Sequence, residues 1–342
     1  VSGSDSNPTL AISLNSLRRI LFTFVSNPHI CHYPSFLFIT QYDTQNFSSL
    51  QEIAGILFHT KALCVIIFLN YTKILQDLPK ILRDVPERNS MFAYKSVFQG
   101  KSLLPPVFTG STLKLFALIF MLIDHIGAVI LEHGVIYSYN NQLPTALSYS
   151  ASLFCSQIDQ VLRGIGRLAF PIFCFLLVEG FFHTSNRKKY AFRLFLFALF
   201  SEIPFDLAFN SSILEFSYQN VMFTLLLGLL TIWGMEKARF IHPLLPILPA
   251  AAGIFAGWIF QADYDWRGIV LIIVLYVFYQ YPLEKTVAGC LCLLWEPLAC
   301  LAFIPLNMYN HKKGQGMKYL FYLFYPVHLL ILFCIRYAIF QI

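Results

Sequence analysis

The sequence has few charged residues and lacks several motifs of soluble enzymes. Only 12% of its 342 residues are Asp, Glu, Lys or Arg, against roughly 25% in soluble globular proteins. The eight cysteines form no CxxC pair and most lie in apolar runs, which argues against a zinc site and a disulfide framework. No Walker or dinucleotide-binding motif occurs, so we do not expect an ATP-driven pump.

The sequence is rich in hydrophobic residues. They account for 57% of the chain, with 35 Phe, and this composition predicts a protein of the lipid bilayer. The net charge is +6, but Lys and Arg fall in short clusters between apolar runs, as in the cytoplasmic loops of membrane proteins. They form no continuous basic patch, so no nucleic-acid partner is expected.

Apolar segments follow one another from Leu113 to the C-terminus. A helix needs about 20 residues to cross about 30 Å of hydrocarbon, and only helices satisfy the backbone of such a segment in lipid. The predicted fold class is therefore all-α, a polytopic transmembrane helical bundle of about 8 to 10 spans. The candidate spans are 113–133, 164–183, 190–209, 220–235, 243–260, 267–281, 286–309 and 318–340.

Basic loops set the predicted orientation. Lys and Arg follow the second and fourth candidate spans, at 187–189 and 237–239, whereas the loops 206–219 and 261–266 contain neither. The basic loops are therefore expected to face the cytoplasm.

One segment conflicts with this alternation. If 286–309 crossed the membrane once, Lys312 and Lys313 would lie outside. Pro297 interrupts that segment and breaks a helix before it. We therefore predict a two-part segment that returns to the cytoplasmic side.

Residues 1–110 differ in kind, with weak apolar stretches between polar ones. We expect an accessory or poorly ordered extension with a possible hydrophobic helix at 53–82, ahead of a transmembrane domain at 111–342. No charged region leads into a cleavable apolar segment, so no signal peptide is expected.

Asp124 and His125 stand side by side at the centre of the apolar run from Leu113 to Leu131. An ionisable residue at the bilayer centre costs roughly 2.5–3.5 kcal/mol, and by default it marks a functional site. The alternative is a pair that only packs against a neighbouring helix. Adjacent helical side chains point about 100° apart, so Asp124 is not expected to orient His125 directly, and Glu179 or Glu202 is the predicted partner.

Further ionisable residues lie within the candidate spans. Glu202 and Asp206 are four residues apart and share a helix face, although Asp206 also fits a helix end in the interface. His328 is either functional or a packing residue, and Arg167 is either functional or directed to the interface. Asn220 suits a helix cap, and the 263–267 loop suits an interfacial belt.

Together these residues have the chemistry for general base catalysis. Imidazole titrates near neutral pH and takes a proton from an amine or hydroxyl nucleophile, while a carboxylate fixes its tautomer and stabilises the cation. Proton relays in transporters use the same residue types. Both an enzyme and a proton-coupled carrier of small solutes are therefore consistent with the residues.

Five stretches carry a family resemblance. They are STLKLFALIFMLIDHIGAVIL, IGRLAFPIFCFLLVEGF, RKKYAFRLFLFALFSEIPFDLAF, NVMFTLLLGLL and KYLFYLFYPVHLLIL. In order and spacing they resemble the TraX family of integral membrane proteins, from about Ser111 to Arg336.

The resemblance implies an activity and a location. The family's founding member is associated with N-terminal acetylation of conjugative pilin, and the family is similar to multi-pass acyltransferases. We therefore expect transfer of acetyl from cytoplasmic acetyl-CoA to an amine or hydroxyl acceptor, a peptide N-terminus or a cell-envelope glycan, at the bacterial plasma membrane. His125 would be a general base or transient acetyl carrier. The other expected site residues are Asp124, Glu179, Glu202, Asp206 and His328, with Arg167 or Arg193 holding a negatively charged part of the donor.

Overall fold

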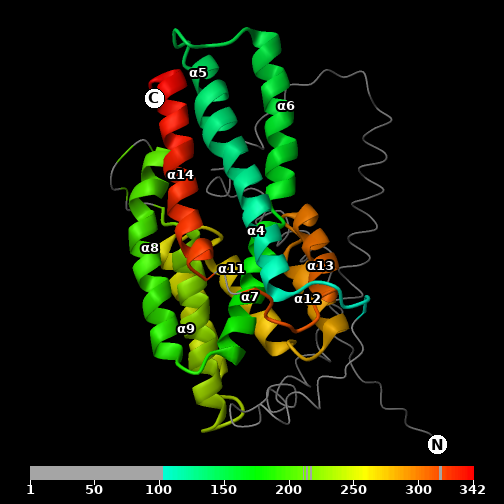
Figure 1. The fold of residues 1–342 in the computed structure, drawn as a ribbon. Coiled ribbons are helices and arrows are strands. Elements are labelled where there is room, and N and C mark those ends of the chain that lie inside the picture. Colours follow the sequence, from blue (N-terminus) through cyan, green and yellow to red (C-terminus); the bar gives the residue numbers. More distant parts are fainter. Residues whose placement is uncertain (1–102, 211, 213–214, 216–217, 316–317) are drawn as a thin grey trace, which may run out of the picture. The chain divides into compact units, whose positions relative to one another are not determined.

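The computed structural model describes residues 103–342, except 211, 213, 214, 216, 217, 316 and 317 (Figure 1). Nearly all of the predicted 1–110 extension, including the helix expected at 53–82, lies outside the described residues. Within them the chain forms helices and no strand. The all-α prediction is confirmed for this part of the chain.

The predicted apolar segments all coincide with helices. In chain order these are α4 (Gly110–His125), η5 (Ile126–Ile136), α5 (Tyr137–Asn140), α6 (Tyr149–Gly166), α7 (Ala169–His183), α8 (Arg187–Asn210), α9 (Val221–Arg239), α10 (Ile247–Phe260), α11 (Asp265–Val277), α12 (Pro282–Cys292), η6 (Pro297–Ala302), α13 (Phe303–Asn307) and α14 (Lys318–Phe340).

Four helical stretches in the described part are long and apolar enough to cross a membrane. They are Gly110–Asn140, Tyr149–His183, Val221–Arg239 and Tyr322–Phe340. The prediction of a membrane protein is thus supported, whereas the predicted 8 to 10 spans are supported only for these four.

A continuous helix of 31 residues carries the Asp124–His125 pair. It begins at a cap, where Thr109 Oγ1 accepts from the Thr112 backbone N–H at 3.2 Å, and runs through α4, η5 and α5 (Figure 1). η5 is a π-helix that starts directly after His125. π-helical segments are rare and occur frequently at functional sites.

The second predicted span starts too late in the sequence. It was expected at 164–183, but α6 already begins at Tyr149 and leads into α7 with a short break. The cause is that α6 buries polar residues, including Asp159, and exposes apolar ones such as Phe154 and Val161. A search for apolar runs overlooks a helix whose polar face is turned inward.

Gly166 allows α6 to approach α4 closely beside the Asp124–His125 pair. A Cβ atom at position 166 would lie 2.2 Å from the Asp124 Cβ and 2.7 Å from its Cα. Any larger side chain at this position would therefore push the two helices apart.

The 286–309 segment has two parts and reverses direction, whereas its return to the cytoplasmic side stays a prediction. After α12 the chain turns near Glu296 and comes back through η6 and α13, and the Val107 N–H then donates to the Met308 carbonyl at 2.8 Å. The Gly110 N–H donates to the Lys312 carbonyl, also at 2.8 Å. Residues 308–313 therefore lie beside the start of α4.

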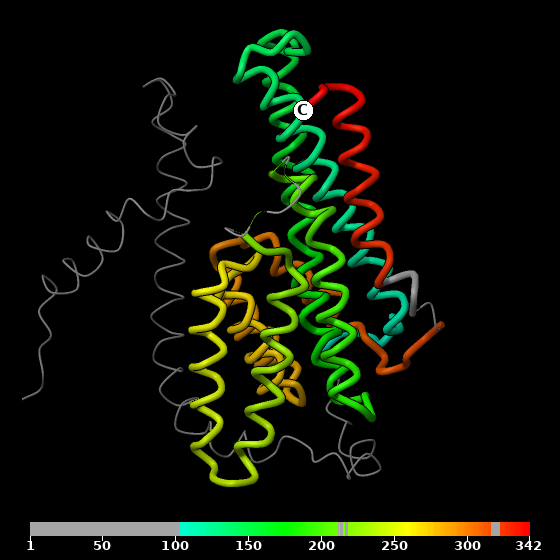
Figure 2. Tube along the Cα trace, turned by 90° about the vertical axis from the view of Figure 1, so that its left-hand side faces the viewer, coloured from blue at the N-terminus to red at the C-terminus, as the bar shows by residue number. Residues whose placement is uncertain are grey.

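The basic loops gather at one end of the bundle. Arg187, at the start of α8, forms a buried ion pair with Glu236 near the end of α9. The Tyr309 hydroxyl reaches Glu179, near the end of α7, at 2.8 Å. We call this the basic end. It contains the start of α4, the α7–α8 turn, the end of α9 and residues 308–315 (Figure 2).

Candidate functional site

Half-buried His125 and buried His328 form a pair between α4 and α14. Their Nδ1 and Nε2 atoms lie 2.6 Å apart, and the ring centroids are 4.9 Å apart with the planes nearly parallel. Tyr325 and Phe209 pack edge-on against the His125 ring. His328 is only 5% exposed. Two residues 203 positions apart in the sequence thus share one hydrogen bond.

The surroundings of His328 determine which nitrogens carry protons. Its Nδ1 lies 2.7 Å from the Phe324 carbonyl, and because a carbonyl only accepts, Nδ1 must donate. In neutral His328 the Nε2 is then the acceptor. The proton between the rings therefore belongs to His125 Nδ1, and the lone pair of His125 lies on Nε2. This arrangement makes His125 Nε2 a base or nucleophile with a fixed tautomer.

Asp124 binds a different helix from His125, as the divergence of adjacent helical side chains predicts. Arg163 of α6 donates from Nη1 to Asp124 at 2.5 Å, and its Nε lies 4.0 Å from Glu132 of η5. Asp124 thus joins α4 to α6, while His125 joins α4 to α14.

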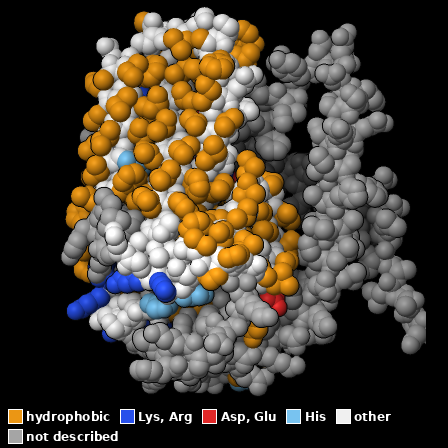
Figure 3. All heavy atoms as spheres, turned by 45° about the vertical axis from the view of Figure 1, so that its right-hand side comes forward, with side chains coloured by type: hydrophobic (Ala, Val, Ile, Leu, Met, Phe, Trp, Pro, Cys, Tyr) orange, Lys and Arg blue, Asp and Glu red, His pale blue; other side chains and the backbone are white. Residues whose placement is uncertain are grey.

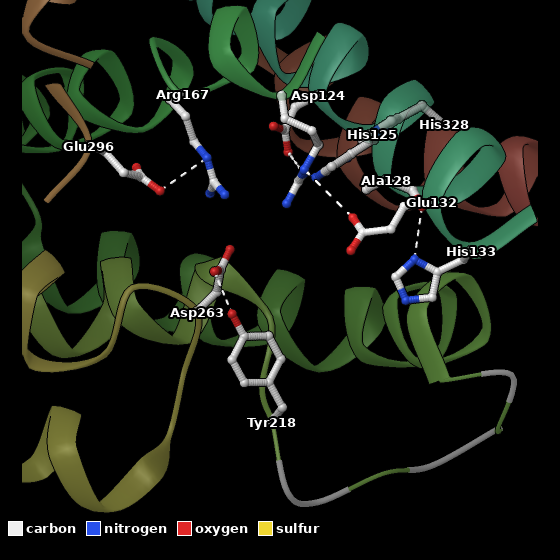
Figure 4. A network of polar contacts seen from close by, with 11 residues as sticks. Asp124, His125, Ala128, Glu132, His133, Arg167, Tyr218, Asp263, Glu296 and His328 are labelled. Carbon is white, nitrogen blue, oxygen red and sulfur yellow. Dashed lines mark hydrogen bonds and ion pairs between the residues drawn. The ribbon is translucent and has the colours of Figure 1, made fainter. Parts of the chain in front are cut away.

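The Asp124–Arg163 pair belongs to a larger polar network (Figure 4). Arg167 Nε lies 3.0 Å from Glu296, at the turn after α12. In the α10–α11 loop, Asp263 accepts from the Tyr218 hydroxyl at 2.7 Å. Burial raises the pKa of Asp263, while Tyr218 and Arg167 act in the opposite direction.

Carboxyl groups outnumber guanidinium groups in this network. Figure 4 shows Asp124, Asp263 and Glu296, which come from different elements, around the region that contains Arg167. Acidic side chains that act electrostatically on one another and on Arg163 and Arg167 are Asp124, Glu132, Asp159, Asp263 and Glu296. The region is therefore suited to a positively charged or hydrogen-bond-donating group.

The predicted carboxylate partner of His125 is wrong, because Glu179 and Glu202 both bind elsewhere. Glu179 lies at the basic end and accepts from the hydroxyls of Tyr279 and Tyr309. Glu202 accepts from the Asn220 side chain, which also donates to the Ala198 carbonyl. The imidazole of His328 takes the place that we expected a carboxylate to occupy.

Asp206 and Asn220 both have local structural partners. Asp206 accepts from the Glu215 N–H at 2.8 Å and from the Asn210 side chain. It therefore has partners separate from those of Glu202, although the two share a helix face. Asn220 caps α9 as predicted, because its Oδ1 accepts from the Met222 N–H at 2.9 Å.

The two predicted donor-binding arginines are far from equivalent. Arg167 is paired with Glu296 inside the network. Arg193 lies on α8 within electrostatic reach of Tyr190 and Tyr322. Their role in holding an anionic donor stays a prediction, and so do the catalytic roles assigned to the carboxylates.

Several residues of the polar network were not predicted from the sequence. Asp159 and Arg163 are four residues apart, a spacing that places them on one helix face, but they precede the apolar run that marked the second span. Glu296 lies next to Pro297, and only the proline carried a prediction. Asp263 was interpreted as part of an interfacial belt, whereas it lies within the network.

The chain is similar in sequence to a known protein family and to a described protein. No solved structure matches. The chain is 34% identical over 223 residues to a protein of Dichelobacter nodosus described as "Probable fimbrial assembly protein FimC, serogroup H1", covering 55% of this chain and 88% of that protein. The model of the TraX family, described as "TraX protein", matches residues 109–336. The chain therefore belongs to the TraX family.

Proposed function

We propose that the protein is an integral membrane acyltransferase that moves acetyl from acetyl-CoA to an amine or hydroxyl acceptor. One observation carries the proposal: the hydrogen bond from His125 to His328, which leaves the His125 Nε2 lone pair as a proton acceptor. A general base of this kind contributes about 10²- to 10⁴-fold to a reaction rate. Acyl transfer to an amine or hydroxyl requires a base that removes the proton of the attacking nitrogen or oxygen, and His125 Nε2 is positioned as such a base.

The chemistry at His125 follows from its tautomer. An ammonium acceptor first releases one proton to water. The neutral amine, or a hydroxyl, then gives a proton to Nε2 as its nitrogen or oxygen forms a bond to the carbonyl carbon of the thioester. The carbon–sulfur bond breaks, and the departing thiolate takes the proton from Nε2. His328 supports the transient imidazolium of His125 by accepting from its Nδ1–H, while the Phe324 carbonyl holds His328 in place.

The carboxyl-rich network supports an acceptor that is an amine. A primary amine is an ammonium ion near neutral pH. Among the described residues, Asp124, Asp159 and Glu296 each have a buried carboxyl oxygen without a hydrogen-bond partner, and these oxygens can accept from its N–H groups. The described name of the Dichelobacter nodosus relative places that protein in fimbrial assembly. We therefore propose the N-terminus of a pilus or fimbrial subunit as acceptor, with an envelope glycan as the hydroxyl alternative.

The topology completes the proposal. The basic end faces the cytoplasm, in agreement with the positive-inside rule, and the protein crosses the bacterial plasma membrane several times. α8, α10 and α11 then add crossings to the four long apolar stretches, toward the predicted total of 8 to 10. Acetyl-CoA would approach from the basic end.

Labelled acetyl-CoA provides the test. Membranes containing the full chain are expected to transfer label to one acceptor, which mass spectrometry then identifies. Membranes without the chain are the control. If purified protein transfers no acetyl to peptide, amine or glycan acceptors and instead couples solute uptake to proton flux, the acyltransferase proposal fails in favour of the transporter.

A further inference from the structure

A second polar cluster lies at the basic end, apart from the histidine pair. Glu179 accepts from Tyr309 at 2.8 Å and from Tyr279, and His183 Nδ1 lies 3.5 Å from the same carboxylate. His311 packs against Tyr309, with ring centroids 4.8 Å apart. The cluster therefore joins the end of α7, the turn before α12 and the segment after α13.

Lys285 is the exceptional member of this cluster. It is only 5% exposed, and its Nζ lies 4.9 Å from the centre of the Phe175 ring. Glu179 attracts the ammonium group, but no ion pair within 4.0 Å joins the two. Among the described residues, no side-chain hydrogen-bond acceptor meets this ammonium group. A cation on a residue that is almost wholly buried, with an aromatic ring and no close carboxylate beside it, leaves its N–H groups available to an anionic group.

We propose that Lys285 binds a phosphate group at the basic end, with His183 and His311 completing the site. Lysine is a common phosphate ligand because its compact ammonium group donates in three directions. His311 is within electrostatic reach of Lys285, His183 and Glu179. Lys312 and Lys313 are exposed next to it, and Figure 3 shows Lys, Arg and His side chains gathered below the apolar surface at this end.

The phosphate belongs to the acyl donor, and to this extent the inference rests on the proposed function. Glu179 follows Arg167 by 12 residues in a nearly continuous helix, a rise of about 18 Å. Acetyl-CoA is elongated, with its phosphates at one end and its thioester at the other end of a flexible arm. Its phosphates at Lys285 and its thioester near the polar network are compatible with this separation.

The binding of phosphate is expected to depend on pH. Burial lowers the pKa of Lys285 to about 8, with Glu179 acting in the opposite direction, so the ammonium is charged below that pH and lost above it. The titratable groups within electrostatic reach of Lys285 are Glu179 of α7 and His311 after α13; His183, Tyr279 and Tyr309 contact Glu179. Burial also lowers the pKa of His311, so this histidine adds little positive charge at neutral pH.

Equilibrium binding of adenosine 3′,5′-bisphosphate to the full chain in phosphatidylcholine nanodiscs tests the site. Lys285→Met is expected to weaken binding roughly 10- to 100-fold, the loss of a hydrogen bond to a charged group. Lys285→Arg should retain most of the affinity. Lys237→Met is the matched control, because Lys237 is exposed at the same end and lies over the Trp233 ring; it should bind as the unmodified chain does.

The pH series needs no variant and guards against misfolding of Lys285→Met. In the unmodified chain, affinity should fall as the pH rises through 8 or above, and Lys285→Arg should lack this decline. Unchanged affinity in folded Lys285→Met, or a flat pH profile in the unmodified chain, overturns the site.

Two further measurements distinguish failure of the phosphate site from failure of the proposed acetyl transfer. If the probe binds through Lys285 but no acetyl transfer occurs with any acceptor, the phosphate site stands and the proposed function fails. If acetyl transfer occurs with an unchanged KM for acetyl-CoA in Lys285→Met, the donor site is wrong. Nanodiscs containing phosphatidylglycerol identify the source of the phosphate: loss of probe binding there assigns the site to a lipid headgroup and overturns the donor assignment.

Discussion

Replacing His125 with alanine is expected to lower the rate of acetyl transfer by about 10²- to 10⁴-fold, the contribution of a positioned general base. The substitution removes the Nε2 lone pair and leaves the Asp124–Arg163 pair on the opposite side of α4 intact. Folding should therefore be retained. Single-turnover transfer from labelled acetyl-CoA by the purified chain measures the effect.

Two variants serve as controls for this substitution. His133 follows in the same continuous helix. Its Nδ1 lies 2.8 Å from the Ala128 carbonyl, and its ring packs edge-on against Phe209 without contacting His328, so His133→Ala should keep most of the activity. In His328→Gln the amide oxygen can still accept from His125 Nδ1–H, whereas His328→Leu has no acceptor. The account requires His328→Gln to be clearly more active than His328→Leu. Equal activity of these two, or full activity of His125→Ala, contradicts it.

Replacing Asp124 with alanine is expected to lower the free energy of unfolding by about 1–3 kcal/mol, the cost of leaving a part-buried charged group without its hydrogen-bond partner. The side chains of Arg163 and Asp124 are 24% and 15% exposed. Without Asp124, Arg163 keeps one ion pair among the described residues, the 4.0 Å contact of its Nε with Glu132. Unfolding in a series of SDS concentrations measures the change.

The double variant Asp124→Leu with Arg163→Leu is the control for charge. It removes both ions together, and replacing a buried pair with apolar residues is often neutral or stabilising. It should therefore recover much of the lost stability. If Asp124→Ala is as stable as the unmodified chain but inactive, Asp124 acts in the chemistry and does not mainly join two helices.

The positions of most helices could be predicted from the sequence because a helix that crosses a bilayer requires a long apolar segment. Each of the eight apolar segments overlaps at least one helix, although 164–183 covers the end of α6 as well as α7. The proline at 297 correctly indicated that the 286–309 segment is interrupted. The prediction failed for most of α6, because this helix buries Asp159, exposes Phe154 and has no long apolar run. It also gave no sign of the π-helix η5.

The site was predicted as a set of residue types and not as a set of contacts. His125 and His328 were both expected to be functional, and nothing in their spacing indicated that they meet. Which side chains pair depends on the rotation and register of helices distant in sequence, such as α4 and α14. For the same reason Glu179 was assigned to the wrong partner, and Lys285 was overlooked at the edge of an apolar segment.

The protonation of the histidine pair tests the central claim most directly. ¹⁵N NMR of the full chain with labelled histidine, with resonances assigned through His125→Ala and His328→Gln, reports which ring nitrogens carry protons. The account predicts neutral rings with protons on Nδ1 of both histidines and an unprotonated His125 Nε2. A proton on His125 Nε2, with Nδ1 accepting from His328, would contradict the assignment of His125 as the base.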